Sequence, residues 1–290
     1  MIVDKILQFI GPNTDKVLID ELLYEFRDEI SYAITRQLFR KREEKASLRL
    51  SGIGKCLRGQ AYTMHGHKPN QPAPQAKMKF LYGDIVEALV VILAKHAGVL
   101  LSDEQKEVHL EDVMGHIDGI VLHDDIKYLF ECKSMSEQSF KRFVQVGMSD
   151  DPFGYVSQAN SYAYALGLDH IVWVGVCKST GKMHEEIRKV DTDLAKRTIE
   201  NIRRLKSCRN PTQFDRFPAK EETFGRKTKK NGMDNRTGNI LLDTGCGYCN
   251  HNRTCWGSEV TLFLRGKTFK HYVGDIVHGE WTAGGRIIND

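Results

Sequence analysis

The sequence contains no apolar run long enough to cross a membrane. Its longest such run, Ile85–Ala94, is interrupted by Glu87 and falls far short of the roughly 20 residues that a membrane helix needs. The first eleven residues also lack the charged-then-apolar pattern of a secretion signal. We therefore expect a soluble, cytoplasmic protein that has no membrane partner.

The chain also lacks a strong charge bias and a nucleotide-binding loop. It has 42 basic and 38 acidic residues, a net charge of +4, which permits nucleic-acid binding without indicating it. The stretch Gly175–Lys182 resembles a phosphate-binding loop, but it has five residues between its glycines and Met183 after the lysine, so it fails the required spacing. No ATPase is expected. A length of 290 residues with 41% hydrophobic residues suits one large or two small globular domains.

Cysteine is scarce, and its distribution is uneven. Only seven are present, and three of them crowd together as Cys246, Cys249 and Cys255. In a cytoplasmic chain these thiols should be reduced, which favours roles as ligands or core residues over disulfides.

The most informative stretch of the sequence predicts three consecutive strands. The first ends over Val108–Leu110, the second covers Gly115–Leu122 and the third covers Ile126–Lys133. A two-residue turn at Asp124 and Asp125 would pair His123 with Ile126. That register places Asp118 opposite Glu131, with Lys133 on the same face because side chains alternate along a strand.

The predicted pairing carries chemical information. Directly opposed residues have Cβ atoms about 4.5–5.5 Å apart, and like charges at that separation are destabilising. Asp118 and Glu131 therefore need a cation. Lys133 supplies one in part, and a hard divalent ion, which takes carboxylate oxygens, supplies the rest. The alternative is a solvated charged face, which is what most charged hairpins form.

The remaining pattern predicts an α/β fold with a mixed central sheet flanked by helices. Helical periodicity covers residues 2–9, 15–44, 77–97, 137–146, 152–166 and 192–207, and two further strands are expected over residues 170–177 and 182–190. Gly83 and Glu87 share one helix face, as do Gln158 and Tyr162. Residues 211–239 are polar and irregular, and the last thirty residues show no clear period.

Four short motifs occur in a characteristic order: Gly83-x-x-x-Glu87, Gly115-x-x-Asp118, Glu131-Cys132-Lys133 and Gln158-x-x-x-Tyr162. Together they resemble the PD-(D/E)XK nuclease superfamily in its RecB-like branch. The resemblance implies a restriction-endonuclease-like core. It also implies Mg²⁺ or Mn²⁺ bound by Asp118, Glu131, Glu87 and the carbonyl of Cys132. Lys133, Gln158 and Tyr162 would complete the catalytic set.

The cysteines extend the resemblance. Cys56 precedes the predicted core, and Cys246, Cys249 and Cys255 follow it, an arrangement similar to the iron–sulfur clasp of AddB-type and CRISPR-adaptation nucleases. Thiolates are the soft ligands that a 4Fe–4S cluster needs. A four-cysteine structural zinc site remains the alternative.

These likenesses predict three regions and one activity. Residues 1–50 would be an N-terminal helical region, 51–256 the nuclease core closed by the clasp, and 257–290 a C-terminal extension. The implied function is a metal-dependent DNA exonuclease acting on single strands or duplex ends in recombination, repair or phage DNA metabolism. The implied protein partner is a recombination, helicase or CRISPR protein. The alternatives are a catalytically inactive iron–sulfur DNA-binding adaptor and a CRISPR spacer-acquisition nuclease.

Overall fold

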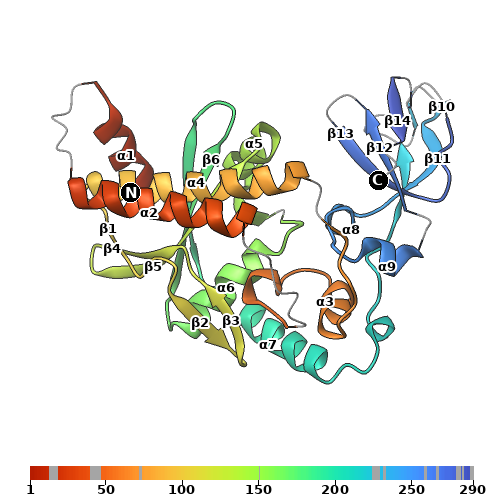
Figure 1. The fold of residues 1–290 in the computed structure, drawn as a ribbon, viewed down its shortest axis with the longest axis horizontal. Coiled ribbons are helices and arrows are strands. Elements are labelled where there is room, and N and C mark those ends of the chain that lie inside the picture. The colour runs from red at the N-terminus through yellow and green to blue at the C-terminus, as the bar shows by residue number, and fades with distance from the viewer. Residues whose placement is uncertain are drawn as a thin grey trace. The chain divides into compact units, whose positions relative to one another are not determined.

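The computed structural model describes residues 1–12, 19–39, 47–71, 74–149, 151–223, 229–230, 233–257, 260–265, 268–278, 282 and 284–287. Within them the chain divides into two compact units (Figure 1). Unit 1 comprises residues 1–54 and 72–204, and unit 2 comprises residues 55–71 and 205–290. The three regions expected from the sequence are chain segments rather than spatial units, and their limits stay a prediction.

Unit 1 is built on a mixed five-stranded sheet of order β1-β4-β5-β6-β7, in which β5 and β6 are parallel and the other neighbours are antiparallel. This sheet, flanked by helices, confirms the predicted α/β class. Its strands are β1 (Leu100–Ser102), β4 (Gly119–His123), β5 (Ile126–Met135), β6 (His170–Cys177) and β7 (Met183–Lys189). A separate two-stranded sheet pairs β2 (Glu107–Leu110) with β3 (Val113–His116).

Helices cover both faces of the five-stranded sheet. One core cluster joins α1 (Ile2–Ile10) and α4 (Pro74–His96) to alternate residues of β5, among them Phe130 and Cys132. The opposite face carries Glu131 and Lys133 and receives α5 (Glu137–Val146) and α6 (Tyr155–Ala165). The remaining helices of unit 1 are α2 (Asp20–Ile34), which continues into the π-helical turn η1 (Thr35–Phe39) and packs along α4, and α7 (Thr192–Lys206).

The β4–β5 hairpin follows the predicted register. His123 pairs with Ile126, and the ladder continues to Gly119 opposite Phe130. The two turn residues, Asp124 and Asp125, have φ values of 48° and 59°, the positive pair that a type I′ turn requires. Aspartate tolerates this conformation better than most residues do. The turn therefore fixes which residues of the two strands face each other.

The prediction of one continuous strand over Gly115–Leu122 was wrong. The segment forms two strands, β3 and β4, that separate at Ile117 and Asp118 and belong to different sheets. The strand β2 pairs with β3, and the unpredicted β1 takes the place beside β4. Asp118 therefore lies at a break in the backbone ladder rather than inside it, one residue before β4 begins.

The prediction that residues 211–239 are irregular was also wrong, since this segment contains strands. Unit 2 contains a second five-stranded sheet of order β14-β12-β13-β11-β8. Its strands are β8 (Lys220–Thr223), β11 (Arg236–Leu241), β12 (Val260–Arg265), β13 (Thr268–Val273) and β14 (Gly285–Ile287), and a short pair is formed by β9 (Lys229–Lys230) and β10 (Met233–Asp234). The helices of unit 2 are α3 (Leu57–Met64), α8 (Thr244–Gly247) and α9 (Asn252–Trp256).

The interior of the unit 2 sheet holds a carboxylate. Glu222 of β8 is buried and accepts hydrogen bonds from Thr237, Asn239 and Tyr272, and the ammonium of Lys270 pairs with it. These donors satisfy the buried charge and tie β8, β11 and β13 together. Three short 3-10 turns complete the description: η2 (Leu50–Gly52), η3 (Gly147–Ser149) and η4 (Pro211–Gln213). Across the described ranges of the chain, none of the helices is both long and apolar enough to span a membrane.

Candidate active site

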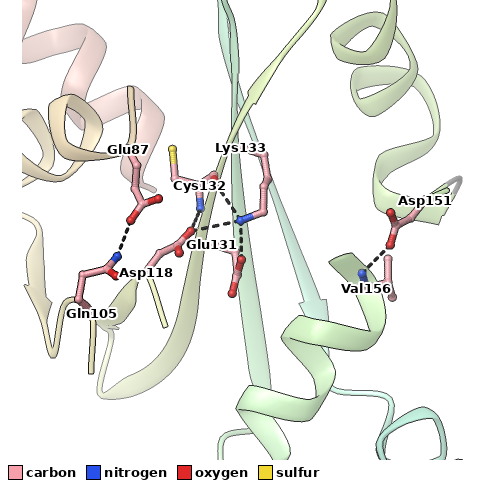
Figure 2. A network of polar contacts seen from close by, with 8 residues as sticks. All are labelled: Glu87, Gln105, Asp118, Glu131, Cys132, Lys133, Asp151 and Val156. Atoms are coloured by element: carbon pink, nitrogen blue, oxygen red, sulfur yellow. Dashed lines mark hydrogen bonds and ion pairs between the residues drawn. The ribbon is translucent and has the colours of Figure 1, made fainter. Parts of the chain in front are cut away.

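Asp118, Glu131 and Lys133 converge at the point where β4 meets β5 (Figure 2). The Lys133 ammonium donates to Glu131 Oε2 at 2.7 Å and to Asp118 Oδ2 at 3.3 Å. Asp118 Oδ2 also accepts the backbone N–H of Cys132 at 2.8 Å. One ammonium therefore joins the two carboxylates.

Burial gives these groups unusual proton affinities. Desolvation and the charge of Asp118 raise the pKa of Glu131 to about 7, although Lys133 acts in the opposite direction. Burial by itself would lower the pKa of Lys133, but Asp118 and Glu131 outweigh it and the pKa rises well above its ordinary value. Lys133 therefore keeps its proton at neutral pH. Perturbed groups of this kind gather at functional sites more often than elsewhere.

One oxygen of this cluster is left without a partner. Glu131 is fully buried, and its Oε1 accepts no hydrogen bond from any described residue. A buried carboxylate oxygen without a donor is costly, and a hard cation would satisfy it. Within the described residues, however, no three His, Cys, Asp or Glu side chains converge closely enough to hold a metal ion as they stand. Lys133 supplies the positive charge between the two carboxylates and also donates to the carbonyl of Cys132 at 3.0 Å.

Glu87 adds a third carboxylate from helix α4. Burial first, and then the charge of Asp118, raise its pKa well above the ordinary value. Glu87 and Asp118 line a pocket of about 410 Å³ that α2 borders on one side. Among the described lining residues seven are acidic and two are basic: Glu25, Asp28, Glu29, Asp84, Glu87, Glu104 and Asp118 against Arg36 and Lys95. The oxygen donors and the surplus of negative charge fit a divalent cation.

The helix α6 brings the last two predicted residues to the same face. The carboxylate of Asp151 accepts the backbone N–H of Val156 at 2.7 Å (Figure 2) and that of Phe153 at 2.9 Å, and so caps the start of the helix. Gln158 and Tyr162 are both buried. Burial and the charges of Glu131 and Asp118 raise the pKa of Tyr162, so its hydroxyl stays protonated near the carboxylates.

The two glycines of the predicted motifs differ in their surroundings. A Cβ at Gly115 would lie 2.5 Å from Cε1 and 2.6 Å from the hydroxyl of Tyr162, so only glycine fits there. A Cβ at Gly83 would meet only Ser134 Oγ, at an ordinary 3.9 Å. Gly115 is therefore part of the packing that holds Tyr162, whereas Gly83 is not needed to avoid a clash within the protein.

Three neighbours of the site have no assigned role in the sequence-based prediction. The Lys133 ammonium lies 5.5 Å from the ring centroid of Tyr155 and 6.0 Å from that of Trp173, the distance range of cation–π contacts. Trp173 pairs with Glu131 across β5 and β6, a parallel register that sequence periodicity does not reveal. Gln105 donates from its amide to Glu87 Oε1 at 2.7 Å, and nothing in the sequence distinguishes it from any turn glutamine.

The four predicted cluster cysteines all belong to unit 2, and all seven cysteines of the chain are free thiols. Cys56 immediately precedes α3, Cys246 lies in α8, Cys249 follows α8 and Cys255 lies in α9. Burial and the nearby Cys56 and Cys249 raise the pKa of Cys246 to about 11, despite a lowering contribution from Trp256. Burial and then Cys56 and Cys255 among its neighbours likewise raise the pKa of Cys249. The four sulfurs are thus close enough to affect one another's ionisation.

Cationic and N–H groups lie beside these thiols, yet burial keeps the pKa of Cys246, Cys249 and Cys255 above its ordinary value. A Cβ at Gly59 would lie 3.1 Å from Cys249 Sγ, so the glycine lets this sulfur approach α3. The backbone N–H of His251 donates to the same sulfur at 3.4 Å. Burial raises the pKa of Cys255, and the guanidinium groups of Arg58 and Arg216 partly offset that rise. Within the described residues, these thiols do not form a group arranged to hold a metal ion.

Comparison with known proteins adds little at the sequence level, because no family model and no curated protein matches this chain. Several solved structures are similar over part of it, among them the following three. An alkaline exonuclease from Laribacter hongkongensis (LHK-Exo) has a TM-score of 0.43 at 12% identity, covering 57% of this chain and 88% of its own. The structure of SSO0001 has a TM-score of 0.40 at 14% sequence identity, and the match covers 65% of this chain and 87% of SSO0001. A phage-related exonuclease from Haemophilus somnus 129PT has a TM-score of 0.40 at 11% sequence identity, and the match covers 55% of this chain and 91% of the exonuclease. At this level of similarity they carry no weight for the activity of this chain.

Proposed function

We propose that the protein is a divalent-metal-dependent DNA exonuclease of the RecB-like type. The observation that carries the proposal is the contact of Lys133 with both Asp118 and Glu131, because two buried carboxylates and a lysine at one strand end are the groups that phosphodiester hydrolysis needs. Glu87 and the unpartnered Glu131 Oε1 add oxygen donors. The residues that would hold Mg²⁺ or Mn²⁺ are Asp118, Glu131, Glu87 and the carbonyl of Cys132.

In this proposal each residue of the site has a separate role. A divalent ion, when bound, supplies a Lewis acid and lowers the pKa of a coordinated water. Lys133 keeps its proton on Nζ and stabilises negative charge that develops on the phosphate. Tyr162 and Gln158 hold the substrate backbone in position, and Tyr155 and Trp173 restrict the lysine to one orientation. The substrate in this proposal is a single strand or a duplex end of DNA.

The cysteines belong to the same proposal. Cys56, Cys246, Cys249 and Cys255 would hold a 4Fe–4S cluster that joins two distant parts of the chain, with structural zinc as the alternative. Closing a long loop is where such a clip restricts the unfolded chain most. The proposed setting is recombination, repair or phage DNA metabolism, beside a recombination, helicase or CRISPR protein.

Digestion of end-labelled DNA tests the proposal. With Mg²⁺ or Mn²⁺, Asp118→Ala and Lys133→Ala should abolish degradation while a gel shift in EDTA still detects DNA binding. Lys141→Ala is the matched control, because this exposed lysine of α5 pairs only with Glu137 among the described residues. Degradation at the wild-type rate by either site variant would overturn the proposal. Binding without cutting by the wild-type protein, in every metal tried, would instead identify a DNA-binding adaptor.

A further inference from the structure

The turn between β1 and β2 has an unusual backbone. Asp103 and Gln105 have φ values of 57° and 55°, in the left-handed region that residues other than glycine rarely adopt. The ammonium of Lys106 pairs with the Asp103 carboxylate at 2.8 Å, and the backbone N–H of Lys106 donates to the Asp103 carbonyl at 3.2 Å. Strained residues of this kind persist only where surrounding contacts hold them, and they occur preferentially at functional sites.

The contacts that hold this turn lead to the active-site elements. Gln105 donates to Glu87 Oε1, and the preceding residue, Glu104, pairs with Lys95 at 2.5 Å, so two adjacent side chains contact the helix α4. The backbone N–H of Ile117 donates to the carbonyl of Lys106 at 3.1 Å. That bond connects the turn to the strand break that carries Asp118. Glu87 and Asp118 are thus positioned by the same four-residue turn.

We propose that Gln105 is a positioning residue for Glu87. Its amide holds one carboxylate oxygen, and Figure 2 shows the other oxygen of Glu87 turned away from Gln105. Gln105, Glu87 and Asp118 line the same pocket. Fixing Oε1 reduces the rotational freedom that Glu87 must lose when a divalent ion binds beside Asp118. The inference rests on the proposed function, since it assigns Glu87 to the metal.

An amide suits this role better than a charged donor does. A hydrogen bond to a carboxylate is charge-assisted and orients it. A lysine or arginine at the same place would neutralise Glu87 and compete with the incoming cation. Glutamine donates one hydrogen bond and adds no positive charge that would compete with the ion. Partners that orient metal ligands in this way typically change metal affinity by 10–100-fold when they are removed.

Mn²⁺ binding without DNA tests the inference, measured from the loss of the free-ion electron paramagnetic resonance signal. Gln105→Met keeps the side-chain length without the donor, and it should raise the Kd for Mn²⁺ by about tenfold. In digestion assays the KM for Mn²⁺ should rise by a similar factor, while kcat at saturating Mn²⁺ changes less than about twofold. Gln105→Gly, which also relieves the positive φ, should weaken binding equally.

Asp103→Asn is the matched control, because it removes the ion pair with Lys106 on the same turn but leaves the Gln105 amide in place. Its Kd should equal that of the wild type. A wild-type Kd in both Gln105 variants, or an equal loss in Asp103→Asn, would overturn the positioning role alone. Failure of the wild-type protein to bind Mn²⁺ or to digest DNA would overturn the proposed function and, with it, this inference.

Discussion

Gly115 and Gly83 both occupy motif positions, yet only one of them is required by packing. Gly115 faces Tyr162 at a distance that leaves no space for a Cβ, whereas a Cβ at Gly83 would make only an ordinary contact with Ser134. At the scale of single residues, then, packing within the protein requires glycine at the second motif position but not at the first.

Alanine at these two glycines should have opposite effects on stability. Gly115→Ala forces Tyr162 or Leu50 to move and should lower the free energy of unfolding by about 1–3 kcal/mol. Gly83→Ala lies in the interior of α4 and should raise it by about 0.5–1 kcal/mol, because alanine favours helix over glycine. Urea denaturation measures both values. Equal destabilisation by the two variants would contradict the packing described here.

Glu222 predicts how acid affects unit 2. Burial favours the protonated form, but Lys270, Tyr272 and Thr237 outweigh burial and lower the pKa of this carboxylate. The folded state therefore keeps Glu222 charged at a pH where the unfolded state has already bound a proton. Its contribution to stability is present above the ordinary pKa of glutamate, about 4.3, and is lost as the pH falls through the lower folded-state pKa.

Glu222→Gln should lower the free energy of unfolding at pH 7 by about 1–3 kcal/mol, since the Lys270 pair is lost. It should also flatten the acid side of the profile of melting temperature against pH. Thermal melts between pH 7 and pH 3 provide the measurement, and Glu221→Gln, the exposed neighbour, is the control. Parallel acid limbs in wild type and Glu222→Gln would show that this carboxylate does not couple folding to pH.

At the scale of elements, the β4–β5 hairpin sets the geometry of the site. The turn at Asp124 and Asp125 fixes the register that leads to Glu131, and both residues adopt positive φ at a cost. Asn at 124 and Gly at 125 suit this turn better than the native pair does. The Asp124→Asn, Asp125→Gly double variant should therefore raise the free energy of unfolding by about 1 kcal/mol, measured by urea denaturation, with digestion unchanged. A lower stability would mean that the turn is not of the proposed type.

The elements also show what the sequence could predict. The register of the hairpin was predictable, because a two-residue turn leaves His123 and Ile126 only one pairing. The break at Asp118 was not, because the alternating pattern on either side is the same although the partner strands differ. The C-terminal sheet was missed for a related reason. Its strands are three to six residues long and lack a detectable period.

Some residues of the candidate site were also predictable from the sequence, and others were not. The hairpin register brought Asp118, Glu131 and Lys133 together in the prediction, and the structure places both carboxylates within hydrogen-bond distance of Lys133. Gln105 and Trp173 could not have been predicted, because the first reaches Glu87 through a strained turn and the second depends on a parallel register. The catalytic and metal-binding roles themselves stay predictions.

At the scale of the whole molecule, the chain leaves unit 2 after residue 71, forms most of unit 1 and returns to unit 2 at residue 205. Cys56 lies before that excursion and Cys246, Cys249 and Cys255 lie after it. A metal centre on these four thiols would bind the two parts of unit 2 to each other. It would therefore stabilise a unit that is discontinuous in sequence.

The loss of one thiol should reveal the metal centre. Protein purified without air should be brown and contain iron, and Cys249→Ala should lose both colour and iron and melt at a lower temperature. Cys208→Ala, which removes a thiol of unit 2 outside the set, is the control and should behave as the wild type. Zinc in place of iron would favour the alternative centre. Unchanged metal content and melting temperature in Cys249→Ala would exclude a clasp.

The most direct test of the central claim is digestion of end-labelled DNA by Glu131→Gln in the presence of Mn²⁺. This substitution keeps the shape of a fully buried side chain and removes its charge. We predict that degradation falls by at least about 100-fold while a gel shift in EDTA still detects DNA binding, because the substitution removes one of the two carboxylates that contact Lys133. Degradation at the wild-type rate would contradict the account.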